Sequence, residues 1–148
     1  MRLSLTKSLL LILLAALCFA AWSWWRPYEW HPDPGAGFRI TGTEVTRDHD
    51  YHWVLVRLER VGKNPHNLAK PARLVLENGR ELEPADTRMT GNPEQGVTAL
   101  SFKFWLEPGS LAGTLRLRLN EGTLSVKATT GEPALGIDGQ DYFNSNHW

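Results

Sequence analysis

The chain has 148 residues, of which 16 are basic and 16 acidic, and it contains a single cysteine. Nothing in this balance indicates a nucleic-acid surface, which needs a clustered basic field, so we expect no nucleic-acid partner. Because the only cysteine, Cys18, lies in an apolar N-terminal run, an intrachain disulfide is excluded, as are a cysteine-based zinc site and a thiol nucleophile in the folded part. The length suits one domain of about 110 residues after a distinct N-terminal segment.

An apolar run without any charged residue extends from Leu9 to Trp25, and Arg2 and Lys7 precede it. As a helix it rises about 1.5 Å per residue and is roughly 25 Å long, slightly shorter than the ~30 Å hydrocarbon core of a bilayer. Tryptophans stand at the C-terminal end of the run, and tryptophan side chains are typical of the headgroup level of a bilayer. We therefore expect residues 1–30 to form a transmembrane anchor that contacts the membrane through residues 9–25. The preceding positive charges favour a cytoplasmic N-terminus and a periplasmic or extracellular C-terminal domain in a bacterial-type envelope.

Two interpretations of the apolar run stay open. It is an uncleaved signal anchor, which the tryptophan cluster favours, or a cleaved signal peptide. Small residues at positions −3 and −1 in Cys18-Phe19-Ala20 and in Ala21-Trp22-Ser23 suit cleavage. A lipoprotein would carry its lipid on Cys18, but Leu17 stands before it, where a small residue is usual.

A proline-rich segment follows the anchor. Three prolines within residues 27–34 prevent a continued helix and favour extended conformations. We assign residues 31–37 to a short, stiff stalk and residues 38–130 to a β-sandwich domain. Residues 131–148 are expected to form a C-terminal tail that packs on the sandwich.

The first two expected strands begin at Phe38 and at Tyr51. The second runs to Val61, and its apolar residues Val54 and Val56 alternate with outward positions. A period of two residues is typical of a strand with one buried face.

An Asn-Gly pair at positions 78–79 predicts a type I′ β-hairpin, because both central positions of that turn need a positive φ. A two-residue loop sets Glu77 opposite Arg80, a pair of opposite charges. It also sets Val75 opposite Leu82, an apolar pair.

The remaining segments alternate between polar stretches and strands. Residues 84–96 are rich in Gly, Pro and Asn and predict a loop. Residues 97–106 predict a strand with one apolar face, and residues 115–119 and 124–128 predict a second hairpin around a turn at 120–122. The apolar face of the strand at 97–106 carries Leu100, Phe102, Phe104 and Leu106, and its other face carries Ser101, Lys103 and Trp105.

Six or seven short strands at regular spacing, with no helical pattern after the anchor, predict an all-β fold, an antiparallel immunoglobulin-like β-sandwich. Several motifs occur in sequence: Trp53–Glu59 before Gly62-Lys63-Asn64-Pro65, the Asn78-Gly79 hairpin, Glu83-Pro84 and a Pro108-Gly109 turn. Over residues 51–127 the chain resembles the immunoglobulin-like accessory domains of bacterial envelope lipoproteins and membrane proteins. It lacks the lipobox of the lipoprotein members. The resemblance implies a binding or accessory module, and it supplies no catalytic residues.

A cluster of potential metal ligands lies before the second strand, at Asp48, His49, Asp50 and His52. Carboxylates and imidazoles at this spacing are donors for a divalent cation. The cluster matches no complete metal motif. The alternative is a polar turn in which the aspartates bond to their own backbone.

Trp53, Lys103 and Trp105 form a candidate partner surface, because aromatic rings beside polar and cationic neighbours mark a protein or glycan contact. The alternative is that the C-terminal tail, with Tyr142, Phe143 and Trp148, covers one of these tryptophans.

No cofactor motif, serine elbow or phosphate loop is present, so we expect a protein that is not an enzyme and carries no cofactor. The expected function is that of a membrane-anchored interaction or accessory module for another envelope protein. A small divalent-metal-binding domain is the alternative.

Overall fold

The computed structural model describes residues 5–25, 33–136 and 139–143, except for the side chains at positions 5, 23–25, 142 and 143. The chain divides into an N-terminal unit that ends at His31 and a second unit that begins at Pro32.

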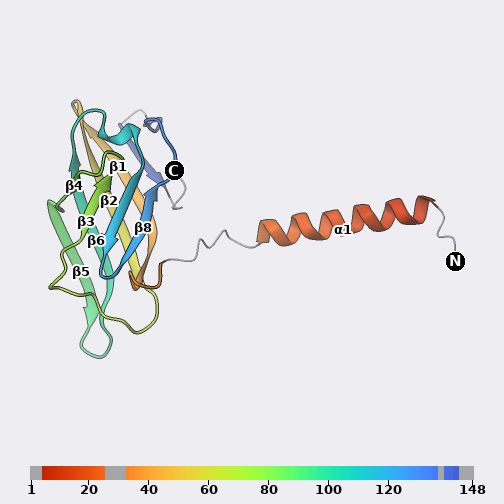
Figure 1. The fold of residues 1–148 in the computed structure, drawn as a ribbon, viewed down its shortest axis with the longest axis horizontal. Helices are drawn as coiled ribbons and strands as arrows, with labels where there is room; N and C mark the ends of the chain where they lie inside the picture. The colour runs from red at the N-terminus through yellow and green to blue at the C-terminus, as the bar shows by residue number, and fades with distance from the viewer. Residues whose placement is uncertain (1–4, 26–32, 137–138, 144–148) are drawn as a thin grey trace. The chain divides into compact units, whose positions relative to one another are not determined.

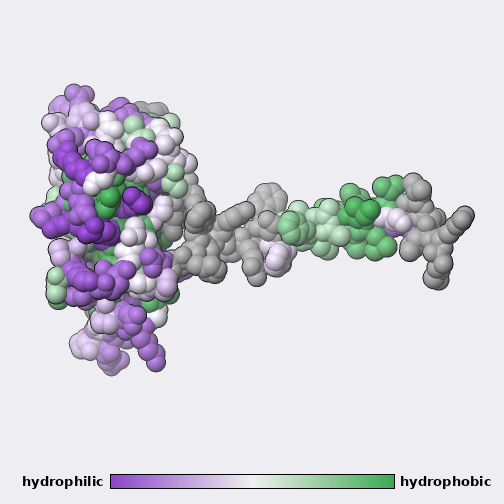
Figure 2. Space-filling view, in the orientation of Figure 1, coloured by the Kyte–Doolittle hydropathy of each residue, from purple (hydrophilic) through white to green (hydrophobic). Residues whose placement is uncertain are grey.

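The N-terminal unit contains helix α1 (Leu5–Trp25). Leucine and alanine, which are strong helix formers, dominate its sequence. Apolar residues lie on all sides of the helix, and the Leu, Ile and Phe side chains between Leu9 and Phe19 are 58–67% exposed. Figure 2 shows this apolar surface along α1. Within the described part of the chain, no helix is long and apolar enough to cross a membrane.

The second unit is built from antiparallel strands, as expected, in two sheets (Figure 1). The five-stranded sheet has the order β5-β6-β2-β1-β9, and the four-stranded sheet has the order β4-β3-β7-β8. The described residues contain nine strands rather than six or seven: β1 (Phe38–Asp48), β2 (Tyr51–Arg60), β3 (Arg73–Leu76), β4 (Glu81–Leu82), β5 (Asp86–Asn92), β6 (Gly96–Leu106), β7 (Leu115–Leu119), β8 (Gly122–Lys127) and β9 (Gln140–Phe143). A short 3₁₀ helix, Ser110–Ala112, precedes β7.

The core lies between the two sheets and follows from the alternation along each strand. The apolar faces predicted for β2 and β6 are buried, and leucines of β3 and β7 are buried with them. Burying a side chain of this size stabilises the fold by roughly 1.5–3 kcal/mol. The buried residues of these four strands are Val54, Val56 and Leu58, then Leu74 and Leu76, then Leu100, Phe102, Phe104 and Leu106, and finally Leu115, Leu117 and Leu119.

The type I′ turn predicted between β3 and β4 is wrong. Of the Asn-Gly pair only Gly79 has a positive φ, of 84°. Gly79 N donates to Leu76 O (2.9 Å), and Leu76 N donates to Arg80 O (2.9 Å), so the loop has three residues. One left-handed residue after a tight turn is sufficient for such a loop.

The three-residue loop shifts the register of this hairpin by one position. Leu74 lies opposite Leu82, and Val75 lies opposite Glu81. A shift of one residue exchanges the faces of a strand, and here it directs Leu82 toward the core. Arg80 pairs instead with Glu107 through two contacts of 2.9 Å.

The loop predicted at residues 84–96 is also wrong, because strand β5 occupies most of it. β5 pairs with β6 in a register that sets Asp86 opposite Lys103 and Met89 opposite Leu100. All seven residues of β5 are exposed, so the strand has no buried face and no apolar alternation. Gly91 and Gly96 belong to the bulge and the hairpin that join β5 to β6.

The segments assigned to the stalk and to the tail both contact the domain. Ala36 and Gly37 are buried, and Asp33 accepts a hydrogen bond from Thr123 N (3.0 Å). Backbone donors, Thr123 N first and then Gly35 N, lower the pKa of Asp33 below its ordinary value. In the tail, Leu135 packs against the core, and β9 pairs with β1 and so becomes the edge strand of that sheet.

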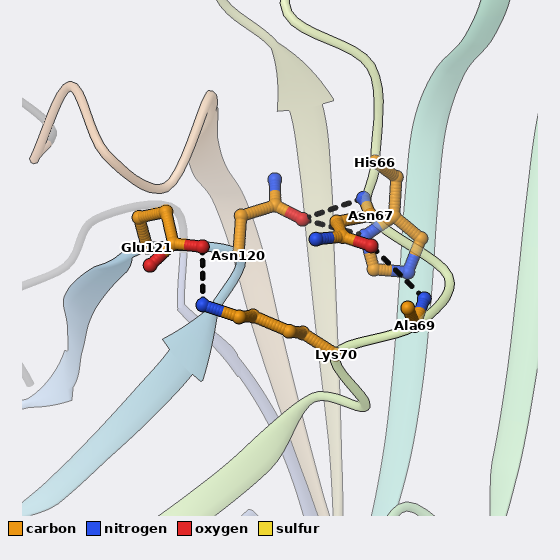
Figure 3. A network of polar contacts seen from close by, with 6 residues as sticks. All are labelled: His66, Asn67, Ala69, Lys70, Asn120 and Glu121. Atoms are coloured by element: carbon orange, nitrogen blue, oxygen red, sulfur yellow. Dashed lines mark hydrogen bonds and ion pairs between the residues drawn. The ribbon is translucent and has the colours of Figure 1, made fainter.

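Asn120 connects three segments that are distant in sequence (Figure 3). Its Oδ1 accepts a hydrogen bond from Asn67 N (2.7 Å) and lies 3.1 Å from His66 Nδ1. Its Nδ2 donates to Ala36 O (2.6 Å). With a φ of 51°, Asn120 is in the left-handed region, which asparagine tolerates better than most residues. This side chain therefore holds the start of the domain, the loop after β2 and the β7–β8 hairpin together.

We predict that Asn120→Ala lowers the free energy of unfolding by about 1–3 kcal/mol, because it leaves backbone groups without partners and strains the left-handed residue. Urea unfolding measures the change. Asn120→Gly removes the hydrogen bonds without the strain and should be less harmful. Asn78→Ala is the control, since Asn78 Oδ1 accepts a single bond in an exposed turn, from Arg80 N. An equal effect of Asn78→Ala and Asn120→Ala would contradict the prediction.

Candidate functional site

Two tryptophans lie side by side on the outer face of the five-stranded sheet. Trp53 of β2 is directly opposite Trp105 of β6. Their neighbours Val54 and Phe104 are fully buried, so the pleat of both strands directs the indoles away from the core. The two ring centroids are 4.3 Å apart with an interplanar angle of 63°, an edge-to-face contact.

Tyr51 and Lys103 complete this aromatic cluster, which we define as Tyr51, Trp53, Lys103 and Trp105. The Tyr51 ring stacks on Trp105, with centroids 4.8 Å apart and planes 18° apart. Lys103 Nζ lies 4.5 Å from the centroid of Trp53, within the range of a cation–π interaction. The structure thus brings together the three residues of the candidate partner surface, and it adds Tyr51.

The alternative, in which the tail covers a tryptophan, names Tyr142, Phe143 and Trp148, whose side chains are outside the described residues. The ring contacts described for Trp105 are with Tyr51 and Trp53.

A shallow groove of about 250 Å³ adjoins the aromatic cluster on the same sheet face. Trp53 and Leu55 supply its apolar part, and ion pairs lie on both sides of it. Arg57 Nη2 is 2.9 Å from Glu44 Oε2 on one side, and Arg88 Nε is 3.4 Å from Asp86 Oδ2 on the other. The residues that line the groove are Glu44, Thr46, Trp53, Leu55, Arg57, Asp86, Arg88, Ser101 and Lys103.

This combination suits recognition of another polypeptide. An apolar strip accepts an apolar side chain, and charged groups of both signs at the rim fix its orientation. Tryptophan, tyrosine and arginine are also the residues that contribute most to binding at protein interfaces.

A second hollow, of about 540 Å³, lies beside Asn120 at the β7–β8 hairpin. Its basic residues are each paired with a carboxylate. Lys70 pairs with Glu121, as Figure 3 shows, and the two arginines pair with glutamates of β4 and the segment after it. Because these charges neutralise one another, the hollow presents no strong field to an anionic ligand.

The structure does not support the metal site predicted at Asp48, His49, Asp50 and His52. The β1–β2 hairpin sets Asp48 opposite Tyr51 and leaves a tight turn in which His49 has a φ of 56°. His49 Nδ1 lies 2.8 Å from Asp48 Oδ1 in solvent, whereas His52 is only 7% exposed and faces the core. The part of the chain that the structure describes contains no group of three or more His, Cys, Asp or Glu side chains suited to a metal ion.

His52 is a buried titratable group at the edge of the core. Within the described ranges of the chain, its Nδ1 has no hydrogen-bond partner. Burial lowers the pKa of His52 below its ordinary value of 6.5, and the charges of Glu132 and Arg47 act on it in opposite directions. The imidazole is therefore held in its neutral form near neutral pH.

We predict that the domain loses stability as the pH falls below about 6.5. The unfolded chain then binds a proton at His52 that the folded chain does not, so the stability contributed above the unfolded pKa is lost as the pH falls through the folded pKa. This single group adds a slope of at most about 1.4 kcal/mol per pH unit. Urea unfolding between pH 7.5 and 4.5 should show the slope, and His52→Gln should reduce it. His49→Gln, in the exposed turn, is the control and should leave it in place.

Comparison with known proteins gave no match: no family model, no curated protein and no solved structure matches the chain. The resemblance to immunoglobulin-like accessory domains of envelope proteins therefore stays a prediction.

Proposed function

We propose that this protein is an interaction module, held at a membrane by its N-terminal helix, whose β-sandwich lies outside the cytoplasm and serves another envelope protein as an accessory domain. The observation that carries the proposal is the aromatic cluster beside the groove on the outer face of β2 and β6. Three aromatic rings and a cation are arranged there by two neighbouring strands.

The order of the strands supports an immunoglobulin-like sandwich. In that fold one sheet contains strands A, B, E and D and the other contains C, F and G. The order β1-β2-β6-β5 corresponds to A-B-E-D, and β3-β7-β8 corresponds to C-F-G. β4 and β9 are then additional edge strands, one in each sheet. Because a fold does not imply a function, this correspondence supports the architecture, and the sheet surface supports the binding role.

The physical case for binding is the cost of leaving large rings in water. An aromatic side chain buries about 150–250 Å² at an interface, and each Å² of apolar surface removed from water contributes roughly 25 cal/mol. Trp53 and Trp105 are not fully buried by their own chain, so a partner gains from covering the part of each ring that remains exposed. The neighbouring ion pairs limit the set of partners that fit, because a wrong charge at the rim is repelled.

The membrane part of the proposal rests on the apolar surface of α1. The run of 17 residues from Leu9 to Trp25 carries no charge. A helix with apolar side chains on every side is typical of a lipid environment rather than of water. A bilayer around it removes the cost of hydrating those side chains, and the positive charges before the run favour a cytoplasmic N-terminus.

We expect the full-length protein to remain in the membrane pellet after extraction with alkaline carbonate. The double variant Leu11→Arg/Leu14→Arg should be released, because each arginine at the centre of a membrane helix costs about 2.5–3.5 kcal/mol. Leu68→Arg is the matched control, since Leu68 is an exposed leucine of the domain, and it should stay in the pellet. Release of the wild-type protein, or recovery of a chain shortened near residue 20, would contradict the anchor.

We expect Trp105→Ala to reduce capture of the partner by about 30-fold, the effect of losing a residue worth 2 kcal/mol at an interface. Capture from native membranes after brief crosslinking, with mass spectrometry of the co-purified proteins, identifies the partner. Purified components then give the affinity. Lys103→Ala should have a smaller effect of the same sign. Arg116→Ala changes an exposed position of β7 in the other sheet and is the control. Equal capture by Trp105→Ala and wild type would refute this surface.

A further inference from the structure

Among the residues that the structure describes, strand β5 has no neighbour on one side and leaves an edge of the five-stranded sheet open. β5 is the terminal strand of that sheet and pairs on one side with β6. Figure 1 shows β5 in light green at the margin of the domain. The N–H and C=O groups on the other side of such a strand form a template for a further strand.

This edge is protected only in part: its charged side chains and its bulge restrict pairing, but no proline or lysine lies within the strand. Residues 86–92 contain no proline and no lysine, and seven residues is a long edge. Pro84 stands before the strand, and the bulge between Thr90 and Gly91 interrupts it at the other end. Six residues, 85–90, lie between these two limits, and the five of them centred on Thr87, residues 85–89, form the stretch considered for pairing.

The sequence of this stretch is complementary to itself. When two copies pair antiparallel with Thr87 opposite Thr87, Asp86 of each copy lies opposite Arg88 of the other. Opposite charges placed directly across two strands attract. On the other face, Ala85 lies opposite Met89, whose side chain is 46% exposed and gains an apolar neighbour.

Asp86 and Arg88 are available for this pairing. They lie on the same face of β5, with Arg88 Nε 3.4 Å from Asp86 Oδ2, and their side chains are 52% and 81% exposed. Centring the pair on Arg88 would oppose two arginines, and centring it on Asp86 would oppose two aspartates. The charges therefore select the register about Thr87.

We propose that two copies of this protein pair through β5, antiparallel about Thr87, and join their five-stranded sheets into one sheet of ten strands. Asp86 and Arg88 also line the groove beside the aromatic cluster. Pairing therefore brings the two grooves, one from each copy, to the same continuous face. The inference rests on the edge strand and does not depend on the membrane anchor or on the partner of the aromatic cluster.

The first test uses charge reversal in the full chain, purified in a density-matched detergent and studied by sedimentation equilibrium. The wild-type protein should dimerise. Asp86→Arg and Arg88→Asp should each raise the dissociation constant about tenfold or more, because each places like charges opposite one another in both halves of the pair. The double variant Asp86→Arg/Arg88→Asp should restore the dimer, and so should an equal mixture of the two single variants.

The second test reads the register directly. In a Cys18→Ser background, Thr87→Cys should form an intermolecular disulfide under mild oxidation, because residues paired across antiparallel strands have Cα atoms about 4.5–5.5 Å apart. Glu94→Cys, at the hairpin between β5 and β6, is the control and should not crosslink. All these positions are exposed, so circular dichroism should show unchanged folding.

Three outcomes would overturn the proposal. They are a wild-type monomer at all accessible concentrations, a dimer that the single charge reversals leave intact, and equal crosslinking at positions 87 and 94. A monomer that instead captures an extended segment of another protein at β5 would assign the edge to a different occupant, and it would also reject pairing between copies.

Discussion

The pleat of β2 and β6 is the constraint on which both the core and the candidate surface depend. Along β2, Val54, Val56 and Leu58 are buried, and the residues between them lie on the outer face with Trp53. The pairing of Trp53 with Trp105 continues the pairing of Val54 with Phe104, so one register positions the core and the aromatic cluster together. A slip of one residue would exchange the two faces, placing the tryptophans in the core and the valines in water. The apolar core thus stabilises the register that the surface needs, and the cross-strand contact of Trp53 with Trp105 adds to it.

Apolar and polar residues alternate along the sequences of β2 and β6, so the buried faces of both strands were predictable. The same rule places His52 with Val54 on the buried face, away from the exposed His49, so the alternation along β2 already argues against a metal site that includes His52. The hairpin at Asn78-Gly79 shows a different limit. An Asn-Gly pair suits a two-residue loop with two left-handed residues, and it equally suits a three-residue loop in which glycine alone is left-handed. The choice between the two loop lengths depends on which register directs Leu82 toward the core, and the local sequence does not contain the residues against which Leu82 packs.

β5 and Asn120 were not predictable, and the reasons are physical. A strand exposed on both faces has no alternation to detect, and the prolines and glycines around β5 are equally typical of a loop. Asn120 stabilises the domain through partners 53 and 84 positions away in sequence. Nothing in a local pattern indicates that an asparagine in a hairpin turn accepts a hydrogen bond from a loop after β2. Local sequence determines the strands well when one face is buried, and it determines edge strands and loop contacts poorly.

The polar character of β5 also bears on why an open edge is tolerable in this domain. An apolar edge strand pairs with any extended chain, which leads to open-ended aggregation. In β5 the alternating Asp86 and Arg88 favour one register, while Pro84 and the bulge at Gly91 limit pairing to a few residues. Pairing about a two-fold axis uses the same edge in both copies, so it closes on itself rather than propagating. The polar, charged sequence of β5 lacks the apolar alternation by which a strand is predicted. The same charges make one pairing register at its edge more favourable than the others. Moreover, because both charged residues also line the groove, the edge and the candidate binding surface share the same two side chains.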